Sequence, residues 1–219
     1  MLDDHPCLAI FDLDNTLLEG DCEDRWGKFL FQKGLVDWTF IDKMYMYYQL
    51  YDEGKLDIHE YQSVFLKPLT EIPLPKLFSL RAEYLHYIKW SVRIKVMHRV
   101  NRFRAKGFVL LMITSCNEFL AEPIARLLNF SNLICTQIRM ADGKYTTTLL
   151  GIPPIRNGKL ERLTCWLEEN QLDLSGSWGY SDSHNDIPLL KAVDNPVAVF
   201  PDRILRSYAE ESGWKIINT

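Results

Sequence analysis

Short apolar runs that end in polar residues recur along the chain, and helix-like stretches separate them. Five such runs predict buried strands, at residues 8–11, 108–113, 133–138, 177–180 and 197–200. Residues 117–129 and 159–170, which lie between these runs, are helix-like. Because strands alternate with helices, the pattern predicts an α/β fold with a mainly parallel sheet.

Residues 139–150, RMADGKYTTTLL, interrupt this alternation. Asp142 and Gly143 stand between two segments of mixed polar and apolar residues, which is typical of the turn of a β-hairpin. We therefore expect a small β-hairpin at the edge of the sheet.

Residues 18–92 contain no convincing strand and are rich in aromatic residues. Tyr45, Tyr48 and Tyr51 recur at helical spacing, and prolines between positions 68 and 75 divide the stretch into at least two helical parts. The simplest interpretation is that the aromatic residues form the core of a helical subdomain. The alternative is that a few of them line a substrate pocket, since the segment follows the first strand and can fold back over its end.

Composition and charge narrow the classes of function. The 219 residues are 47% hydrophobic and 25% charged, which is ordinary for a globular protein. A formal net charge of −4 without a long basic run argues against a nucleic-acid or anionic-membrane partner. The N-terminal apolar run is too short for a signal peptide, and no segment reaches the length of a membrane span. Five cysteines without CxxC spacing are interpreted as reduced thiols of a cytoplasmic protein.

Residues 8–16, LAIFDLDNT, carry the most informative chemistry. Asp12 and Asp14 follow the first apolar run directly, so they are expected at the C-terminal tip of a strand, the edge where ligands bind in open α/β sheets. Two carboxylates this close repel each other and raise each other's pKa. A divalent cation is the simplest partner for such a pair.

Two further sites stand near a predicted strand end or helix start. Thr114 and Ser115 end the run VLLMIT-S, where hydroxyls beside a helix N-terminus suit a phosphate oxygen or, alternatively, only cap the helix. Lys159, in NGKLERL, begins a predicted helix. It is either a solvated charge or a residue with a further function, since a cation at a helix start is unfavourable for the helix dipole.

The last site is GYSDSHNDIPLL, residues 179–190. Asp182 and Asp186 lie four residues apart and Asn185 lies between them, directly after a predicted buried strand. Acidic residues at a helix N-terminus have an electrostatic explanation of their own, and Asp182 could cap the helix. We interpret His184 as a solvent-facing loop residue. Together the four sites supply carboxylates, a hydroxyl and a lysine, which are the groups that phosphoryl transfer needs.

These motifs resemble those of the haloacid dehalogenase superfamily, in the subgroup of phosphoserine phosphatase and histidinol-phosphate phosphatases. FDLDNTLL is similar to the first motif, which implies that Asp12 is the nucleophile and Asp14 the general acid and base. ITSCN is similar to the second motif, which implies that Thr114, with Ser115 beside it, binds phosphate. NGKLERL implies that Lys159 acts in catalysis and in phosphate binding.

The fourth motif of the family resembles GYSDSHNDIPLL. The resemblance implies that Asp12, Asp182 and the backbone carbonyl of Asp14 hold Mg2+, while Asn185 and Asp186 support the metal and its waters. It also implies an aspartyl-phosphate intermediate and a small phosphorylated metabolite as substrate, with phosphoserine and histidinol phosphate as the leading candidates.

The resemblance further implies a Rossmann-like core, formed by residues 1–17 and 93–219, and a helical cap formed by residues 18–92. Asp21 occupies the position near which phosphoserine phosphatases carry a glutamate that meets the substrate's ammonium group. Arg25 and Arg81 are candidates for the matching cap arginine, and we take Asp21 and Arg25 as the specificity residues. The protein is expected to be a monomer or a homodimer.

Three other functions use part of this set of residues. A phospho-accepting receiver-type signalling domain shares the acidic pocket, the hydroxyl and the lysine, but lacks a DxD pair and a second helical domain. A sugar-nucleotide transferase uses DxD to hold a metal, but normally after a nucleotide-binding region for which residue 12 leaves no room. A non-catalytic binding protein would lack a motif residue, and this chain lacks none.

Overall fold

The computed structural model describes residues 6–218, so residues 1–5 of the expected core segment 1–17, and Thr219, lie outside the described residues. Its centre is a seven-stranded sheet in the order β4-β3-β2-β1-β5-β6-β7. The strands are β1 (Leu8–Phe11), β2 (Val109–Asn117), β3 (Asn132–Ala141), β4 (Lys144–Leu150), β5 (Trp178–Ser181), β6 (Asn195–Val199) and β7 (Lys215–Ile217). Every pairing is parallel except that of β3 with β4. The prediction of a mainly parallel sheet with a hairpin at its edge is confirmed.

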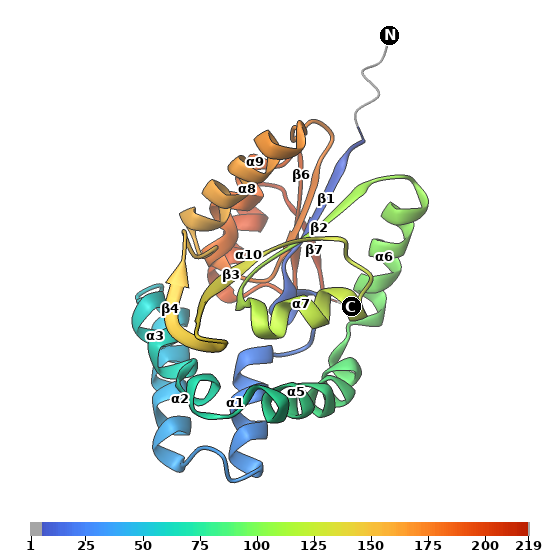
Figure 1. The fold of residues 1–219 in the computed structure, drawn as a ribbon. Helices are drawn as coiled ribbons and strands as arrows, with labels where there is room; N and C mark the ends of the chain where they lie inside the picture. Colours follow the sequence, from blue (N-terminus) through green and yellow to red (C-terminus); the bar gives the residue numbers. More distant parts are fainter. Residues whose placement is uncertain (1–5, 219) are drawn as a thin grey trace.

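Helices cover both faces of this sheet (Figure 1). One face packs against α6 (Ile94–Ala105) and α7 (Glu118–Leu127), and the other against α8 (Asn157–Asn170), α9 (Ile187–Ala192) and α10 (Arg203–Glu211). The apolar run of β1 explains this arrangement, because side chains alternate along a strand. Ala9 and Phe11 enter the core on the α6 and α7 side, whereas Leu8 and Ile10 enter the core on the α8 and α9 side.

Five α-helices occupy the chain between β1 and α6, flanked by two short helical turns, Leu13–Leu17 and Lys89–Ser91. The α-helices are α1 (Cys22–Gln32), α2 (Trp38–Asp52), α3 (Ile58–Phe65), α4 (Lys67–Glu71) and α5 (Leu74–Ile88). They gather at the end of the sheet toward which β1 runs (Figure 1), and α3 and α4 contact the edge strand β4. Side-chain carboxylates of Asp21, Asp37 and Asp57 cap the first three helices by accepting backbone N–H groups, which explains where each begins.

The two chain crossings between these helices and the sheet lie side by side. Leu18 pairs with Val92 in an antiparallel bridge, Glu19 N donates to Ser91 O at 2.7 Å, and Arg93 N donates to Leu17 O at 2.8 Å. The two segments that link the helices α1 to α5 to the sheet are therefore held together next to the loop that carries Asp12 and Asp14. The boundaries of the expected cap, residues 18 and 92, stay a prediction.

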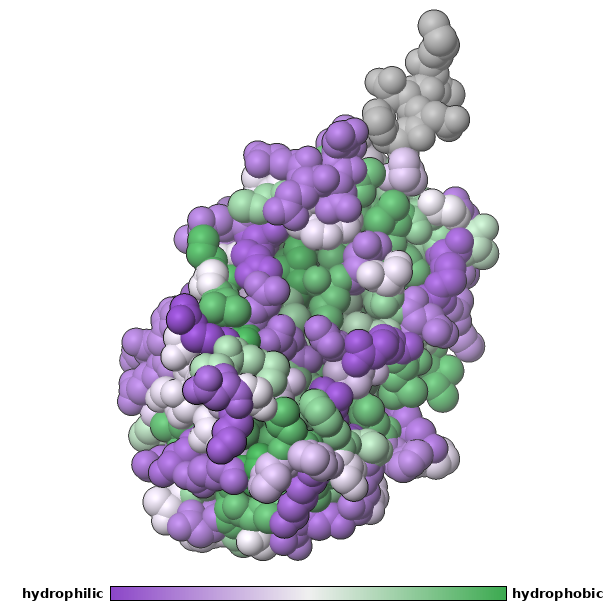
Figure 2. Space-filling view, viewed as in Figure 1, coloured by the Kyte–Doolittle hydropathy of each residue, from purple (hydrophilic) through white to green (hydrophobic). Residues whose placement is uncertain are grey.

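The surface is mixed in polarity. On the face drawn in Figure 2, hydrophobic residues are exposed between hydrophilic ones in the lower part of the view, where Figure 1 places helices α1 to α5. No helix within residues 6–218 is both long and apolar enough to cross a membrane.

All five cysteines are free.

Three local details differ from the sequence interpretation. Strand β2 continues through Asn117, two residues beyond Ser115, whereas Thr114 and Ser115 were expected to end it. Strand β7 was not anticipated, because its three residues are too few to carry a periodic pattern. Asp182 does not cap a helix, because the Ser183 side chain accepts the Asn185 N–H at the start of the helical turn His184–Asp186.

Candidate active site

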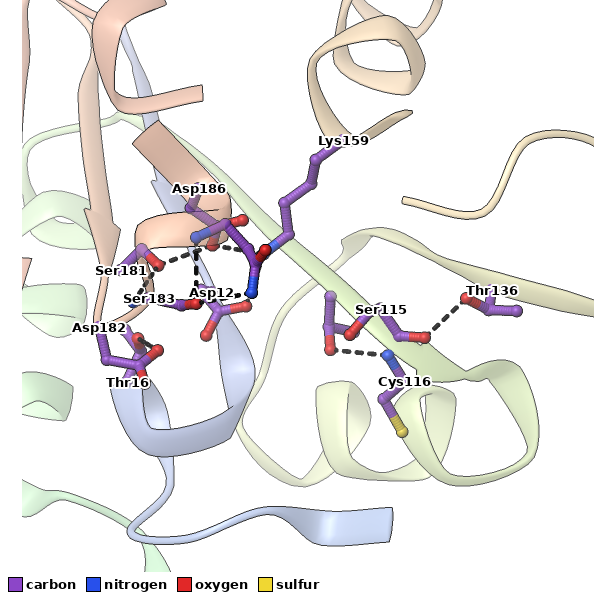
Figure 3. Close-up of polar contacts among 12 residues, drawn as sticks. Asp12, Thr16, Ser115, Cys116, Thr136, Lys159, Ser181, Asp182, Ser183 and Asp186 are labelled. Carbon is purple, nitrogen blue, oxygen red and sulfur yellow. Dashed lines mark hydrogen bonds and ion pairs between the residues drawn. The ribbon is translucent and has the colours of Figure 1, made fainter. Parts of the chain in front are cut away.

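A buried ion-pair network links the first strand to two helices behind it. Asp12 follows β1 directly, and its N–H continues the sheet by donating to Tyr180 O at 2.9 Å. The Lys159 ammonium, from the first turn of α8, donates to Asp12 Oδ1 at 2.7 Å and to Asp186 Oδ2 at 2.6 Å. Ser181 Oγ donates to the same Asp186 oxygen at 2.6 Å. Lys159 is 4% exposed, so it is not a solvated surface charge (Figure 3).

Burial dominates the titration of these acids. It raises the pKa of Asp12 to about 6, although the Lys159 charge acts in the opposite direction. Burial also raises the pKa of Asp14 and of Asp182 well above the ordinary range, and neighbouring carboxylates add to both shifts. The site therefore holds more negative charge than its own lysine neutralises, which is the situation a bound cation relieves.

The loop after Asp12 is fixed by hydrogen bonds. Asp14 Oδ1 accepts the Cys22 N–H at 2.7 Å, which ties the loop to the start of α1. Asn15 has a φ of 54°, a left-handed conformation that asparagine tolerates better than most residues. Its N–H donates to Gly20 O at 3.2 Å, and its side-chain Oδ1 accepts the Gly20 N–H at 3.1 Å. The chain between Asp14 and Cys22 is thus a closed turn that presents the aspartates at the sheet edge.

The segment after β5 brings the third acidic group to the same place. Thr16 Oγ1 donates to Asp182 Oδ1 at 3.2 Å, so the first and fourth motifs touch (Figure 3). Asn185 Oδ1 accepts from Arg156 Nε at 3.2 Å, and its Nδ2 donates to Tyr51 O on α2 at 3.4 Å. Asn185 and Asp186 are both buried.

His184 corrects the sequence interpretation. It belongs to a helical turn and is half-buried, not a solvent-facing loop residue. Its Nδ1 lies 2.9 Å from Asp202 Oδ2, and the same oxygen accepts the His184 backbone N–H at 2.6 Å. Asp202 lies 18 residues further along the chain, so local sequence could not reveal this partner.

The hydroxyl residues of the second motif have different environments. Thr114 is 1% exposed, and its Oγ1 accepts the Cys116 N–H at 3.1 Å. Ser115 lines the cavity described below. Its backbone carbonyl accepts a hydrogen bond from Thr136 Oγ1 at 2.6 Å. Of the two candidates for phosphate binding, Ser115 is the one at the cavity wall.

A cavity of about 360 Å³ lies between the sheet edge and the helices α1 to α3. Among the described residues that line it are eight carboxylates and one cation, Arg93. The carboxylates are Asp12, Asp14, Asp21, Glu23, Asp24, Asp52, Asp182 and Asp202. Four tyrosines of α2 and α3 close the opposite wall: Tyr47, Tyr48, Tyr51 and Tyr61. Some of the aromatic residues of the helical segment therefore do face a pocket.

The specificity candidates separate in the structure. Asp21 lines the cavity, its Oδ1 accepts the Asp24 N–H at 2.8 Å, and burial raises its pKa to about 7. Arg25 is exposed, donates to Glu19 O at 2.7 Å and lines a different hollow. Arg81 donates to Phe119 O at 2.9 Å and is not among the cavity residues either.

The acidic residues that the fourth and first motifs contribute fit a magnesium ion. No three His, Cys, Asp or Glu side chains within residues 6–218 form a ready-made metal cluster. Mg2+ does not require one, because it commonly keeps several waters and takes only one or two carboxylates from the protein. Asp12 and Asp182 line one cavity, and the charge of Asp12 raises the pKa of Asp182. These two side chains, together with the backbone of Asp14, are the groups that could hold it.

Comparisons with known proteins agree with this geometry. The profile of the haloacid dehalogenase-like hydrolases matches residues 9–191. A histidinol-phosphatase of Neisseria meningitidis serogroup C is 37% identical over 217 residues, covering 96% of this chain and 98% of that protein. A phosphoserine phosphatase of Mycobacterium tuberculosis is 29% identical, covering 95% of this chain and 69% of that protein.

Solved structures show the same fold. A protein of unknown function from Bordetella pertussis Tohama I superimposes with a TM-score of 0.90 at 32% identity, covering 98% of this chain and 99% of that one. A phosphoserine phosphatase, in a phospho-aspartyl intermediate analogue, superimposes with a TM-score of 0.70 at 17% identity, covering 99% and 95%. The chain belongs to the haloacid dehalogenase-like hydrolase family, and the relatives that it resembles include phosphatases.

Proposed function

We propose that the protein is a Mg2+-dependent phosphomonoesterase that forms an aspartyl-phosphate on Asp12. The observation that carries the proposal is that Asp12, Asp182 and Ser115 line one cavity, while Lys159 lies behind Asp12 and donates to its Oδ1 at 2.7 Å. These residues come from four separate segments, and each has a part in phosphoryl transfer.

The chemistry follows from the position of each group. An oxygen of the Asp12 carboxylate attacks phosphorus, the bond from phosphorus to the ester oxygen breaks, and Asp14 gives its proton to the departing alkoxide. Asp14 then takes a proton from water, which attacks the same phosphorus and restores the Asp12 carboxylate. Lys159 and Ser115 stabilise the phosphoryl oxygens, and the buried Thr114 supports this segment by accepting the Cys116 N–H. Bound Mg2+ would shield the nucleophile from the charge of the phosphate.

Lys159 also orients the nucleophile. Its ammonium bridges Asp12 and Asp186 with bonds of 2.7 and 2.6 Å, and Ser181 fixes Asp186 from the other side. Because the lysine is buried and its ammonium is bound to both carboxylates, Asp12 is kept in one orientation before substrate binds. This is the preorganisation that lowers the barrier of the chemical step.

We infer that helices α1 to α5 act as a cap over this site. They follow the nucleophile strand, supply the tyrosine wall and return beside their starting point through the Leu18–Val92 bridge. A lid of this kind would exclude water from the acyl-phosphate and would contact the leaving group. Residues 1–17 and 93–219 form the core in this proposal, and residues 18–92 form the cap.

The charge of the cavity favours a substrate with a cationic leaving group and no carboxylate. Eight carboxylates and one arginine line it, and the arginine, Arg93, is engaged with Asn15 O at 3.1 Å and stacked on Phe200. Histidinol phosphate carries an ammonium and an imidazole that suit acids and tyrosine rings. Phosphoserine adds a carboxylate, which the ionised acids of the cavity repel. We therefore rank histidinol phosphate first and phosphoserine second, in agreement with the name of the relative that is 37% identical.

The test is release of inorganic phosphate from these two esters and from an aryl phosphate, with Mg2+ or with a chelator. We expect turnover that needs Mg2+, with a larger kcat/KM for histidinol phosphate than for phosphoserine. A lasting phosphoprotein without turnover would instead favour the receiver-type alternative. Turnover of none of the three esters would refute the phosphatase proposal, and preference for phosphoserine would refute only the ranking.

A further inference from the structure

A buried glutamate at the cavity wall has no role in the chemistry described above. Glu23 is the second residue of α1 and is 5% exposed. On one side it accepts hydrogen bonds from α3, from Tyr61 Oη at 2.6 Å and from Gln62 Nε2 at 3.1 and 3.2 Å. On the other side it accepts the Asn117 backbone N–H at 3.0 Å and the Asn117 side-chain amide, at the end of β2. One carboxylate thus joins three elements that are far apart in the sequence.

These contacts leave Glu23 no capacity to bind substrate. Two carboxylate oxygens offer about four lone-pair sites, and the donors of Tyr61, Gln62 and Asn117 already fill them. Asp21 differs, because its Oδ1 accepts a hydrogen bond from its own helix only, the Asp24 N–H. Of these two acids, Asp21 is therefore available to a ligand, while Glu23 acts on the protein itself.

The neighbouring amides show how strongly the carboxylate organises this junction. Gln62 and Asn117 both direct their amide nitrogens at Glu23. Their carbonyl oxygens, Gln62 Oε1 and Asn117 Oδ1, are buried without a partner among the described residues. An unpaired buried acceptor is unfavourable, so both amides take this orientation because the charged acceptor outweighs that loss.

Asn117 ends the segment that carries the phosphate-binding hydroxyls. Thr114 Oγ1 accepts the Cys116 N–H, and the Ser115 carbonyl accepts Thr136 Oγ1, so the segment 114–117 is held at several points. Glu23 fixes its last backbone N–H. A shift of Asn117 would therefore move Ser115 at the cavity wall, and the position of Asn117 depends on a carboxylate that α3 also holds.

We propose that Glu23 is a positioning residue that couples the seating of α3 over the cavity to the alignment of the segment 114–117 for phosphate. This inference rests on the proposed function, since it takes that segment as the phosphate-binding one. When α3 is in place, Tyr61 and Gln62 saturate Glu23 and fix Asn117. When α3 withdraws, Glu23 loses those donors, and Ser115 is no longer held in register with the phosphate.

The test compares two tyrosines of the helical segment, the half-buried Tyr61 and the buried Tyr84. Tyr61→Phe removes one donor from Glu23. The matched control Tyr84→Phe removes the bond from Tyr84 Oη to Cys22 O, 2.7 Å long, which also ends on α1 but leaves every hydrogen bond of Glu23 and Asn117 in place. We measure binding of inorganic phosphate by calorimetry with Mg2+ present, together with kcat and KM for the best ester and the free energy of unfolding in urea.

We expect Tyr61→Phe to weaken phosphate binding and kcat/KM by about tenfold, because a hydrogen bond to a charged group is lost. Tyr84→Phe should change phosphate binding and kcat/KM by less than about twofold, even if it lowers the free energy of unfolding as much as Tyr61→Phe does. Equal effects of the two variants, or unchanged phosphate binding in Tyr61→Phe, would overturn the proposal, and so would a wild-type protein that binds no phosphate. The phosphatase proposal fails separately, when phosphate binds but no ester turns over.

Discussion

Replacing the buried lysine tests how the site is held together. In Lys159→Met the side chain keeps much of its volume but loses its ammonium, so the bonds to Asp12 Oδ1 and Asp186 Oδ2 both disappear. The two carboxylates remain where they were, with side-chain exposures of 10% and 4%. They become neighbouring buried anions without a cation between them.

The cost follows from that burial. Removing one partner of a buried ion pair typically costs ~3–5 kcal/mol, because the remaining charge is left uncompensated. A domain of ordinary stability has only about 5–15 kcal/mol to lose, so the variant should unfold at a much lower urea concentration. The pair Lys28–Asp24 has the same contact length of 2.6 Å but side-chain exposures of 61% and 39%. Lys28→Met is therefore the matched control and should cost less than about 1 kcal/mol.

The destabilisation should also depend on pH. The pKa of Asp12 is about 6 with Lys159 present, above its unfolded value of 3.8, so the ionised carboxylate already opposes folding above pH 6. Without the lysine, which lowers this pKa, it rises further. A group whose pKa is raised on folding loses its penalty as pH falls through that pKa and it binds a proton. The difference between wild type and Lys159→Met should therefore be largest at about pH 8 and shrink toward about pH 5.

The measurement is urea unfolding of wild type, Lys159→Met and Lys28→Met at several pH values, with a chelator present so that no metal occupies the acidic site. A difference below about 1 kcal/mol for Lys159→Met would show that the network is as weak as a surface ion pair. A full-sized difference that does not change with pH would show that lost packing, and not uncompensated charge, destabilises the variant.

Three further variants test the proposed chemistry. Asp12→Asn should abolish hydrolysis of an aryl phosphate while the circular dichroism spectrum stays that of the wild type; residual turnover would exclude Asp12 as nucleophile. Asp14→Asn should slow turnover by ~100- to 10,000-fold, the usual contribution of general acid–base catalysis, and wild-type kcat would reassign the proton donor. Burial raises the pKa of Asp21 to about 7. Asp21 should therefore lose its charge as pH falls through 7, and the KM for histidinol phosphate should rise. Asp21→Asn should remove that part of the pH dependence of KM, and an unchanged profile would contradict a role for Asp21 in binding the cation.

The sequence predicted the sheet and the meeting of the motifs because both depend on a short-range rule. An apolar run ending in polar residues marks the C-terminal end of a buried strand, and parallel strands end at the same edge. Asp12 and Ser115 therefore had to lie near each other, and the same rule brought Asp182 to this edge. Lys159 was harder to interpret, because nothing in NGKLERL indicates that its side chain is buried between two aspartates.

The residues that escaped prediction make contacts that only the packing of helices decides. Glu23 and Asn117 are 94 positions apart, and Glu23 and Tyr61 are 38 apart. The family resemblance singled out Asp21 by its position after the first motif and gave no reason to choose Glu23, two residues further on. Helix geometry explains Arg25: successive residues are about 100° apart, so Arg25 points roughly opposite to Glu23 and away from the cavity. To choose between neighbouring residues of one helix, one must know which face of the helix is turned toward the cavity, and the sequence does not give this.

The charge of the whole chain and the charge of its cavity have different consequences. A net charge of −4 over 219 residues argues only against polyanionic partners. Eight carboxylates around a cavity of about 360 Å³ are a far denser field, and a phosphate ester entering it brings further negative charge. Lys159 is engaged by two of the aspartates, and Arg93 by a carbonyl. Among residues 6–218 no further cation lines the cavity. In the proposed function, the balancing charge would come from a metal beside the phosphate and from a cation on the leaving group beside Asp21. The same electrostatic deficit would therefore account both for the proposed metal requirement and for the proposed preference for a cationic substrate.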